Sequence, residues 1–414
     1  MGLIDPLTAL VASLGALVLM LIKRVRLGVA LNATAMILAL LSINVEDVPR
    51  VLYSSVDPLT IDGQLVLSIT ITSFGIMLLS QLYKDSGAMD SLNKSLKEVL
   101  RKPKAILTVI PAVIGLLPVA GGALMSAPVV DAVGDELRLS RPKKVYVNLW
   151  FRHLIFLTYP LSPQFIIAVA LTGMTSTALL SIVIPVVVLM AAIGYLASFR
   201  GVKEPSKERG PLRRALGFGS FLRAFSPIAV SIAGALVLGF LSHELSKRGL
   251  DVLIAVVMGL ATLAATGVTA KSLLNALRGP TIYDITLATF GAFLLRNVVS
   301  ASGLSGALKS LVPSGSPGLL LVAAVSTLCG FCLGSASGGL AVSISVLKDV
   351  MNFSFREAAL AYMAACLGYI ISPLHLCLLF TVDYFKADLK EVYKVTLPSF
   401  AVSLAITAML FALI

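Results

Sequence analysis

The feature that most constrains this chain is a series of long apolar stretches that starts at Leu3 and continues to the last residue, Ile414. An α-helix needs about 20 mainly apolar residues to cross a lipid bilayer. Only 13% of the residues are charged and 57% are hydrophobic, which excludes a soluble fold. The sequence therefore predicts an all-α polytopic protein whose main partner is the lipid bilayer of the cell membrane. The stretches cover residues 3–22, 27–43, 64–83, 105–130, 145–171, 176–199, 225–241, 250–268, 282–299, 318–350, 358–385 and 395–414.

The net charge of +12 comes from basic residues in short loops between these stretches. Nucleic-acid binding usually needs a basic domain or stripe, and none is present, so we expect no nucleic-acid partner. Basic loops lie on the cytoplasmic side of a membrane. The loop with Lys23, Arg24 and Arg26 is therefore predicted to be cytoplasmic, and the next loop, with Glu46 and Asp47, to be external. This orientation places both chain termini outside.

Two stretches are predicted to enter the membrane and return on the same side. Stretch 105–130 has basic clusters on both flanks, so both flanks are cytoplasmic only if it forms a re-entrant hairpin. Its glycine-containing middle suits a tight turn, and such irregular backbone is tolerated where it is buried in protein or lines a cavity. A second hairpin at 318–350, with its turn at 334–339, enters from outside.

The two halves of the chain repeat one another. Residues 69–75 (ITITSFG) recur at a constant offset as 285–291 (ITLATFG), and each half has a Ser-Pro pair in its interrupted helix. Such a repeat indicates duplication. We therefore divide the chain into a first repeat at 1–199, a basic cytoplasmic linker at 200–223 and a second repeat at 224–414. Each half crosses the membrane an odd number of times, so the second half is inverted; together they hold about ten transmembrane helices, two re-entrant hairpins and two interrupted helices.

Inverted repeats with discontinuous helices are typical of secondary transporters, whose site lies at the repeat interface near the bilayer midplane. Three motifs, LLPVAGGALMSAPVVDAVG at 116–134, NLWFRH at 148–153 and ISPLHLCLLFTVDYF at 371–385, resemble the domain of unknown function 401 family within the ion transporter superfamily. The resemblance implies alternating access of an elevator-like or rocking kind. The Ser-Asn-Thr signature of dicarboxylate members is replaced by Ala-Gly-Gly and Ser-Ala-Ser-Gly-Gly, so no dicarboxylate specificity follows.

The candidate site residues come from the hairpin turns, the Ser-Pro breaks and the polar residues beside them. A buried cation in a membrane helix is a functional hypothesis by default, and unwound carbonyls with hydroxyls suit Na⁺. The substrate-binding candidates are Gly121, Gly122, Asn148, Arg152, His153, Ser335, Ser337, Gly338, Gly339 and His375. The cation-binding candidates are Ser126, Ser162, Pro163, Ser372 and Pro373.

Each candidate also has a purely structural interpretation. Small residues serve close helix packing, prolines kink helices, and buried histidines are often satisfied within the core. Arg152 could instead reach the interface or pair with Asp131, and Asn148 could hold the arginine. The Cys329 and Cys332 pair has metal-ligand spacing, but we interpret it as buried structural thiols and expect no metal site.

The sequence thus predicts a secondary active transporter for a small anionic substrate, a carboxylate or an oxyanion, coupled to Na⁺ or H⁺. We expect no cofactor other than Na⁺ as a coupling ion, and a homodimer as one option for its assembly. One alternative is the membrane subunit of a tripartite, binding-protein-dependent transporter. Another is an intramembrane hydrolase using Ser337 with His375, but the rhomboid-type Gly-x-Ser-Gly motif is absent, so we predict no catalytic residues.

Overall fold

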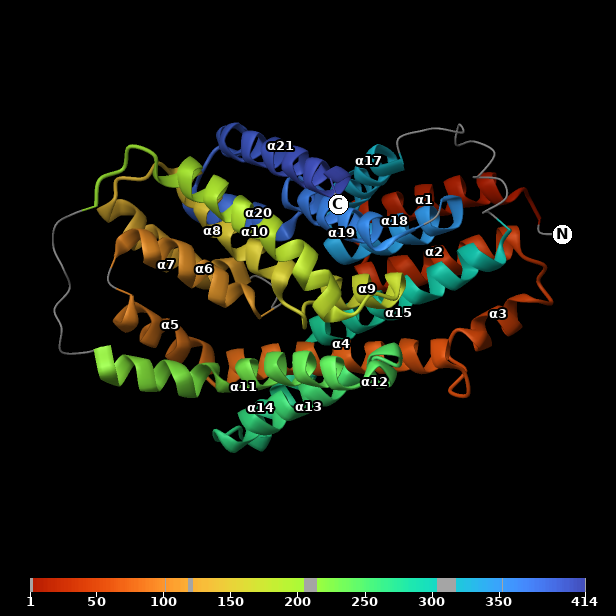
Figure 1. The fold of residues 1–414 in the computed structure, drawn as a ribbon, viewed down its shortest axis with the longest axis horizontal. Coiled ribbons are helices and arrows are strands. Elements are labelled where there is room, and N and C mark those ends of the chain that lie inside the picture. The colour runs from red at the N-terminus through yellow and green to blue at the C-terminus, as the bar shows by residue number, and fades with distance from the viewer. Residues whose placement is uncertain are drawn as a thin grey trace.

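The computed structural model describes residues 3–100, 102–117, 122–204, 214–303, 318–351 and 353–413. Within these ranges the regular secondary structure is entirely helical (Figure 1). Six of the helices are long and apolar enough to cross a membrane, and several shorter apolar helices accompany them. The predicted all-α membrane fold is confirmed. The six span Ile61–Asp85, Arg141–Thr172, Ser176–Phe199, Phe218–Leu241, Pro280–Ala301 and Leu389–Leu413.

The order of the helices is similar in the two halves. The first half contains α1 (Pro6–Ile22), α2 (Leu27–Ser42), α3 (Val48–Ser54), α4 (Ile61–Asp85), α5 (Ala88–Val99), α6 (Pro103–Gly115), α7 (Gly122–Glu136), α8 (Arg141–Thr158), α9 (Pro163–Thr172) and α10 (Ser176–Phe199). The second contains α11 (Arg214–Leu241), α12 (His243–Lys247), α13 (Leu250–Ala265), α14 (Ala270–Leu277), α15 (Pro280–Ala301), α17 (Gly318–Leu333), α18 (Ala336–Val350), α19 (Phe355–Ile370), α20 (Leu376–Phe385) and α21 (Leu389–Leu413). Helix α4 thus corresponds to α15, the pair α6–α7 to α17–α18, the pair α8–α9 to α19–α20, and α10 to α21.

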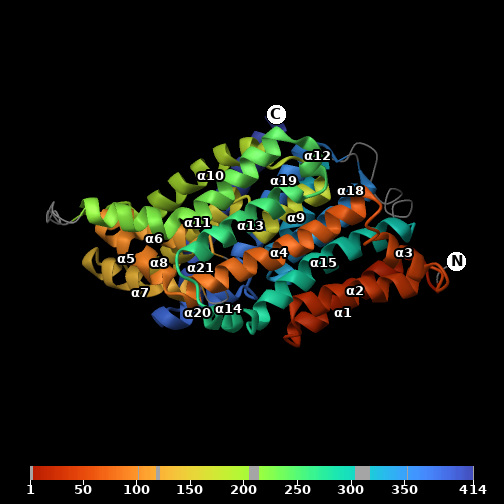
Figure 2. The ribbon, with the colours of Figure 1, turned by 90° about the horizontal axis from the view of Figure 1, so that it is seen from below.

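The corresponding helices α4 and α15 cross each other in opposite directions, as Figures 1 and 2 both show. At their crossing the hydroxyls of Ser73 and Thr289, which are 216 residues apart, form a buried hydrogen bond of 2.9 Å. These two positions are equivalent in the repeat. A two-fold axis that passes between two equivalent residues brings them together in this way. This geometry supports the inverted relation of the two halves.

The halves also exchange packing partners around α4 and α15. Helix α2 packs on α15, and α13 packs on α4. The equivalent glycines Gly75 and Gly291 lie at these contacts: a Cβ atom at Gly75 would stand 2.8 Å from Val256, and one at Gly291 would stand 2.7 Å from Asn32. Each half therefore places a helix against the central helix of the other, with a glycine at the closest approach.

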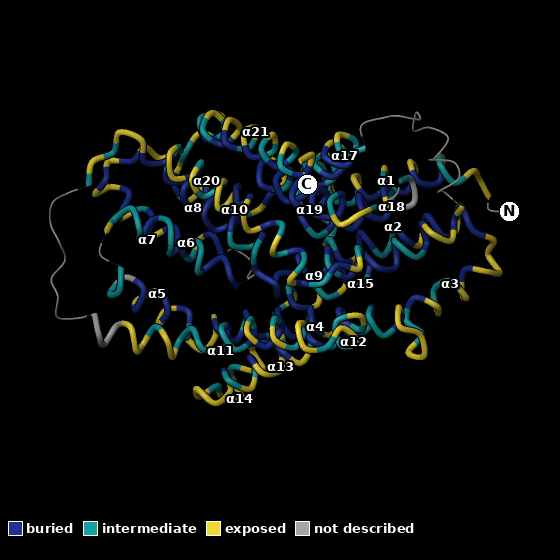
Figure 3. Tube along the Cα trace, in the orientation of Figure 1, coloured by how far each residue is buried: buried dark blue, intermediate teal, exposed yellow. Residues whose placement is uncertain are grey.

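The interrupted helices lie in the interior, and single long helices cover them. The most apolar window of Arg141–Thr172, which combines α8 and α9, is 78% buried, whereas the corresponding windows of α10, α11 and α21 are 28% buried. Figure 3 shows the buried residues gathered along α8, α9 and α19. The exposed faces of the outer helices carry apolar residues such as Val188, Leu196 and Val402. Such faces suit contact with lipid.

Two elements differ from the expected loops. Helix α11 begins at Arg214, so the end of the predicted linker 200–223 is helical and extends a membrane helix. Helix α5 occupies part of the basic flank that precedes the apolar stretch 105–130. Its buried residues Met89, Leu92 and Leu96 recur at the helical period, and it packs on α11. The apolar stripe of α5 is what holds both segments in helical form against each other.

Candidate functional site

The first break separates α8 from α9. Pro160 has no N–H group to donate to the carbonyl of Phe156, so the helix ends there. That carbonyl accepts hydrogen bonds from the Ser162 hydroxyl at 3.0 Å and from the Tyr362 hydroxyl at 3.1 Å, and Tyr362 also lies 3.3 Å from the carbonyl oxygen of Leu157. The next helix starts at Pro163. The carbonyl groups freed by this break are thus capped by protein hydroxyls.

The second break separates α19 from α20. The Ser372 hydroxyl is buried and donates to the carbonyl of Phe331 at 2.5 Å, while it accepts from the Leu374 backbone N–H at 3.1 Å. Tyr393 donates to the carbonyl of Ile371 at 3.1 Å. Both ends of the break are therefore tied to neighbouring helices.

The second break lies against the turn of the second hairpin. Gly334 adopts a φ of +57°, and a Cβ atom there would stand 2.6 Å from the Cβ of Leu374. Glycine allows this left-handed turn and this close approach. Pro373, on the same break, is exposed. A hairpin turn and an interrupted helix, the two sources of the candidate site residues, thus meet here.

At the next position Ser335 caps α18 by accepting the Gly338 backbone N–H at 3.1 Å. A Cβ atom at Gly339 would stand 2.5 Å from Cα of Gly330 on the other arm, so this glycine permits close packing of α17 and α18. Gly338 faces Leu27 of α2 with more room, at 3.3 Å. Ser337 is half-buried in the first turn of α18. The described contacts of Ser335 and Gly339 are thus structural ones.

The first hairpin consists of α6 and α7, and its turn at 118–121, including Gly121, falls outside the described residues. Gly122 is buried at the start of α7. Asn148 on α8 donates to the Ala123 carbonyl at 2.9 Å and accepts from the Ser126 hydroxyl at 2.6 Å. Asn148, Ser126 and Ala123 are all buried. Asn148 therefore joins the second arm of the hairpin to α8 and does not contact the arginine one turn away.

Replacing Asn148 with alanine is expected to lower the free energy of unfolding by about 1–3 kcal/mol, because it removes both hydrogen bonds that join α7 to α8 and leaves only the 3.3 Å bond from the Ser126 hydroxyl to the Ala123 carbonyl. Thermal unfolding of the purified protein in detergent measures the change. The variant Ser126→Ala should lose less, and the double variant should lose less than the sum of the two single variants. Additive losses would show that the two side chains do not interact.

Arg152 lies on α8 between the two breaks and is only 1% exposed. Its Nη2 donates to the carbonyl of Leu117 at 3.3 Å, beside the first hairpin turn, and its guanidinium lies 5.5 Å from the ring centre of Phe156. Its Nε and Nη1 have no hydrogen-bond partner among the described residues. Asp131, the carboxylate considered as its partner, pairs instead with Lys144 at 2.6 Å. Among the residues described, the recorded ion pairs leave Arg152 without a carboxylate.

The two predicted histidines, one from each half, meet beside this arginine. The rings of His153 and His375 are perpendicular, with centroids 4.6 Å apart, and both side chains are buried. Nδ1 of His153 lies 2.7 Å from the Leu149 carbonyl oxygen, and Nδ1 of His375 lies 3.4 Å from that of Ile370. A carbonyl only accepts hydrogen bonds, so Nδ1 carries the proton in each neutral ring. Nε2 of each ring is then a lone pair, with no partner in the part of the chain that the structure describes.

Tyr369 and Cys377 complete this cluster and were missing from the sequence predictions. The Tyr369 ring lies 4.0 Å from that of His375. The ligand atoms of His153, His375 and Cys377 lie within 4.8 Å of one another, a donor set that suits a zinc-like ion. The adjacent buried guanidinium opposes a cation there. The signals available in the sequence were the repeated tyrosine before each Ser-Pro break and the His-x-Cys spacing, both adjacent to a predicted residue.

A cavity of about 10 Å³ lies beside His153 and Tyr369 of this cluster, with room for roughly one water molecule. It is bordered by residues of the first break, the second hairpin and α19. These residues are His153, Phe156, Leu157, Gln164, Ala336, Cys366, Tyr369 and Ile370. The structure therefore brings together Arg152, both histidines, one break and one hairpin turn beside this small cavity. We call Arg152, His153, His375, Tyr369 and Cys377 the central cluster.

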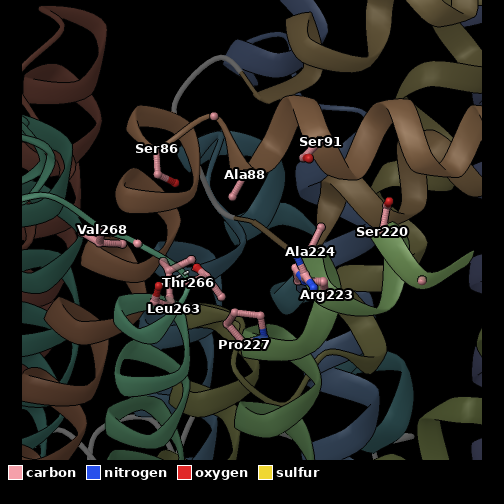
Figure 4. Close-up of a pocket in the computed structure, with 13 residues that line it drawn as sticks. Ser86, Ala88, Ser91, Ser220, Arg223, Ala224, Pro227, Leu263, Thr266 and Val268 are labelled. Carbon is pink, nitrogen blue, oxygen red and sulfur yellow. Dashed lines mark hydrogen bonds between the residues drawn. The ribbon is translucent and has the colours of Figure 1, made fainter. Parts of the chain in front are cut away.

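A larger cavity, of about 580 Å³, opens elsewhere, between the ends of α4, α5, α11 and α13 (Figure 4). Its size suits a ligand, but its charged side chain, Arg223, is exposed, and so are Ser86 and Thr266. None of the predicted site residues borders it. Its full lining is Ser86, Gly87, Ala88, Ser91, Gly219, Ser220, Arg223, Ala224, Pro227, Leu263, Thr266, Gly267 and Val268. Buried polar atoms without partners distinguish the central cluster from this cavity.

Comparison with known proteins gives one family and a shared fold. The family model described as "Protein of unknown function (DUF401)" matches residues 7–414. No curated protein matches the chain. Among solved structures, the YdaH transporter of Alcanivorax borkumensis, a crystal structure described as having an unusual topology, is similar with a TM-score of 0.52 and 15% identity. The similarity covers 96% of this chain and 97% of that one, so the two share a fold.

Proposed function

We propose, for a chain that belongs to the DUF401 family of proteins of unknown function, that it is a secondary active transporter carrying a small carboxylate or oxyanion with Na⁺ or H⁺. The observation that carries the proposal is the guanidinium of Arg152, buried where the two halves meet, with two donor nitrogens unpaired among the described residues. The fold shared with a protein named as a transporter supports the general class.

The charge of Arg152 is the first argument. Burying a cation in a membrane protein costs several kcal/mol unless an anion or water offsets it. The recorded ion pairs of the described chain supply no carboxylate to Arg152, and its single described hydrogen bond goes to a backbone carbonyl. Its remaining N–H groups are donors suited to a carboxylate or an oxyanion. A bound substrate anion would provide the missing negative charge.

The position of the cluster is the second argument. Arg152 and His153 come from α8, His375 lies in the second break at the N-cap of α20, and Ala336 comes from the second hairpin. The site is therefore made of both halves and of discontinuous elements. A cavity of about 10 Å³ is too small for a carboxylate, so the site would have to widen before an anion could enter it. Relative movement of the hairpins and interrupted helices, in a rocking or elevator-like manner, would open it alternately to the two sides.

The test has two stages. The purified protein is first heated with acetate, succinate, citrate, sulfate or phosphate, each with and without Na⁺. An anion that binds only the folded state, present at a concentration of 100 times its Kd, should stabilise the protein by about 2.7 kcal/mol. The stabilising anion is then offered to proteoliposomes under Na⁺ or proton gradients, and we expect accumulation against its own gradient.

The result would separate the proposal from its alternatives. Stabilisation without uptake, restored by a periplasmic binding protein, would indicate the membrane subunit of a tripartite transporter. Failure of every anion both to stabilise the protein and to be taken up would contradict the proposal. The hydrolase alternative has little support, because Ser337 and His375 form no recorded hydrogen bond with each other in the described structure.

A further inference from the structure

We propose that the coupling ion is a proton, carried on Nε2 of His153 or His375, and that this proton and the substrate anion bind together. The inference rests on the proposed function and deepens it, because it assigns the ion that the anion site takes. The geometry behind it is the pair of buried imidazoles from opposite halves, with ring centroids 4.6 Å apart, beside the Arg152 guanidinium.

The oxygens at the two breaks favour a proton over Na⁺. A hard cation needs several oxygen ligands at once. The hydroxyls of Ser162 and Ser372 donate to backbone carbonyls, and the Ser126 hydroxyl donates to Asn148. The carbonyls of Phe156 and Ile371 at the breaks already accept from protein hydroxyls. A sodium ion would have to displace these contacts, whereas a proton needs only the free lone pair of one imidazole nitrogen.

The tautomers of the histidines point to what the pair can bind. Because each Nδ1 faces a backbone carbonyl, each neutral ring presents a lone pair at Nε2. A lone pair repels an anion. Once a proton from water on the open side binds there, the same atom becomes an N–H donor with a positive charge. The protonated ring then adds a second cationic donor to that of Arg152, and the proton leaves to water when the site opens on the other side.

The charges around the rings link the two binding events. The titratable groups that face them in the described cluster are Arg152 on α8, Tyr369 and Cys366 on α19, and Cys377 on α20. Without an anion, a protonated imidazole would lie beside the guanidinium, and two like charges in a buried site are unfavourable. A bound anion offsets both.

Charges farther along the packed helices are engaged elsewhere. Asp131 and Asp135 on α7 pair with Lys144, and Lys348 on α18 donates to the carbonyl of Leu171. The anion is therefore the group that changes the charge at the rings. By thermodynamic linkage the anion favours protonation and the proton favours anion binding by the same factor.

The first experiment reads the protonation of each ring directly. The chain has three histidines, and His243, on the exposed helix α12, serves as an internal reference. In full-length protein labelled with ¹⁵N-histidine and without an added anion, we expect both buried rings to give the resonances of the neutral Nδ1–H form. Adding the anion that stabilises the protein, chosen from acetate, succinate, citrate, sulfate and phosphate, should convert one buried ring to imidazolium.

The second experiment measures linkage. Affinity for that anion should rise about tenfold for each unit of decreasing pH, because one proton binds with each anion. His153→Gln and His375→Gln test the two possible carriers: replacing the ring that takes the proton should abolish the slope, whereas His243→Gln should retain it. Anion binding should also remove protons from a weakly buffered solution. The rise in pH should correspond to one proton taken up for each anion bound.

The outcomes distinguish the two proposals. An anion that binds with pH-independent affinity, or that needs Na⁺, overturns the proton assignment and leaves the anion transporter intact. The absence of binding by any anion overturns both. If Zn²⁺ shifts both Nε2 resonances, and if this shift is absent in Cys377→Ala, the cluster would be a metal-ion site instead.

Discussion

Replacing Arg152 with methionine is expected to weaken anion binding at least about 100-fold while leaving the unliganded protein at least as stable as the wild type. Loss of a charged partner from a buried hydrogen-bonded pair costs about 2–5 kcal/mol, so the loss of affinity is large. The unliganded variant should stay stable because, without an anion, the cost of burying the guanidinium is larger than what its hydrogen bond returns. In the free protein the guanidinium is buried with one described hydrogen bond, and an apolar side chain of similar length removes its desolvation cost.

Isothermal titration with the stabilising anion and thermal unfolding without it measure the two effects separately. Arg152→Lys keeps the charge but not the guanidinium, and it should recover part of the affinity. Arg296→Met is the matched control, because Arg296 lies in the membrane helix α15 and outside the central cluster. Wild-type anion affinity in Arg152→Met would remove this residue from the site.

Replacing Gly339 with alanine is expected to reduce the free energy of unfolding by about 2–4 kcal/mol, whereas the same change at the adjacent Gly338 should have little effect. The new Cβ at position 339 would stand 2.5 Å from Cα and 2.6 Å from the backbone N of Gly330, so the two arms of the hairpin would have to separate. At position 338 the nearest atom is Cδ1 of Leu27 at 3.3 Å, the end of a flexible side chain.

The yield of monodisperse protein and its thermal unfolding in detergent measure the difference between these two variants. Each introduces one methyl group in the same turn of the same helix, so helix propensity and composition are matched. Equal stability of the two would show that α17 and α18 do not pack as closely as described. A loss confined to transport, with both variants equally stable, would instead return these glycines to the substrate site.

Much of the fold could be predicted from the sequence because its main determinants are local. Lipid excludes unpaired backbone groups, so each long apolar stretch must form a helix. Proline removes a backbone N–H and disfavours the helix interior, which placed the breaks near Ser162 and Ser372. Pro185 and Pro398 nevertheless lie inside the continuous helices α10 and α21, so proline alone does not decide where a helix ends. The turn of the second hairpin at Gly334 likewise follows from a local preference for left-handed backbone. Helix α5 was missed because its apolar period was short and lay among basic residues.

The site was only partly predictable because its composition depends on which helices meet. Arg152 and the two histidines were marked by their rarity in apolar surroundings. Nothing in the sequence joins His153 to His375, because the contact crosses between the two halves. The competition for Asp131 was decided by Lys144, which lies in the first turn of α8 and reaches both Asp131 and Asp135. Side-chain partners of this kind are set by tertiary packing.

The hydrogen bond between Ser73 and Thr289 has a consequence for how the protein could change shape. If the first half took up the form of the second while the second took up the form of the first, most contacts would be traded for others. This one would be carried onto itself, because its two members simply exchange roles. In such an exchange α4 and α15 would stay paired at this point while the packing on either side of them is rearranged.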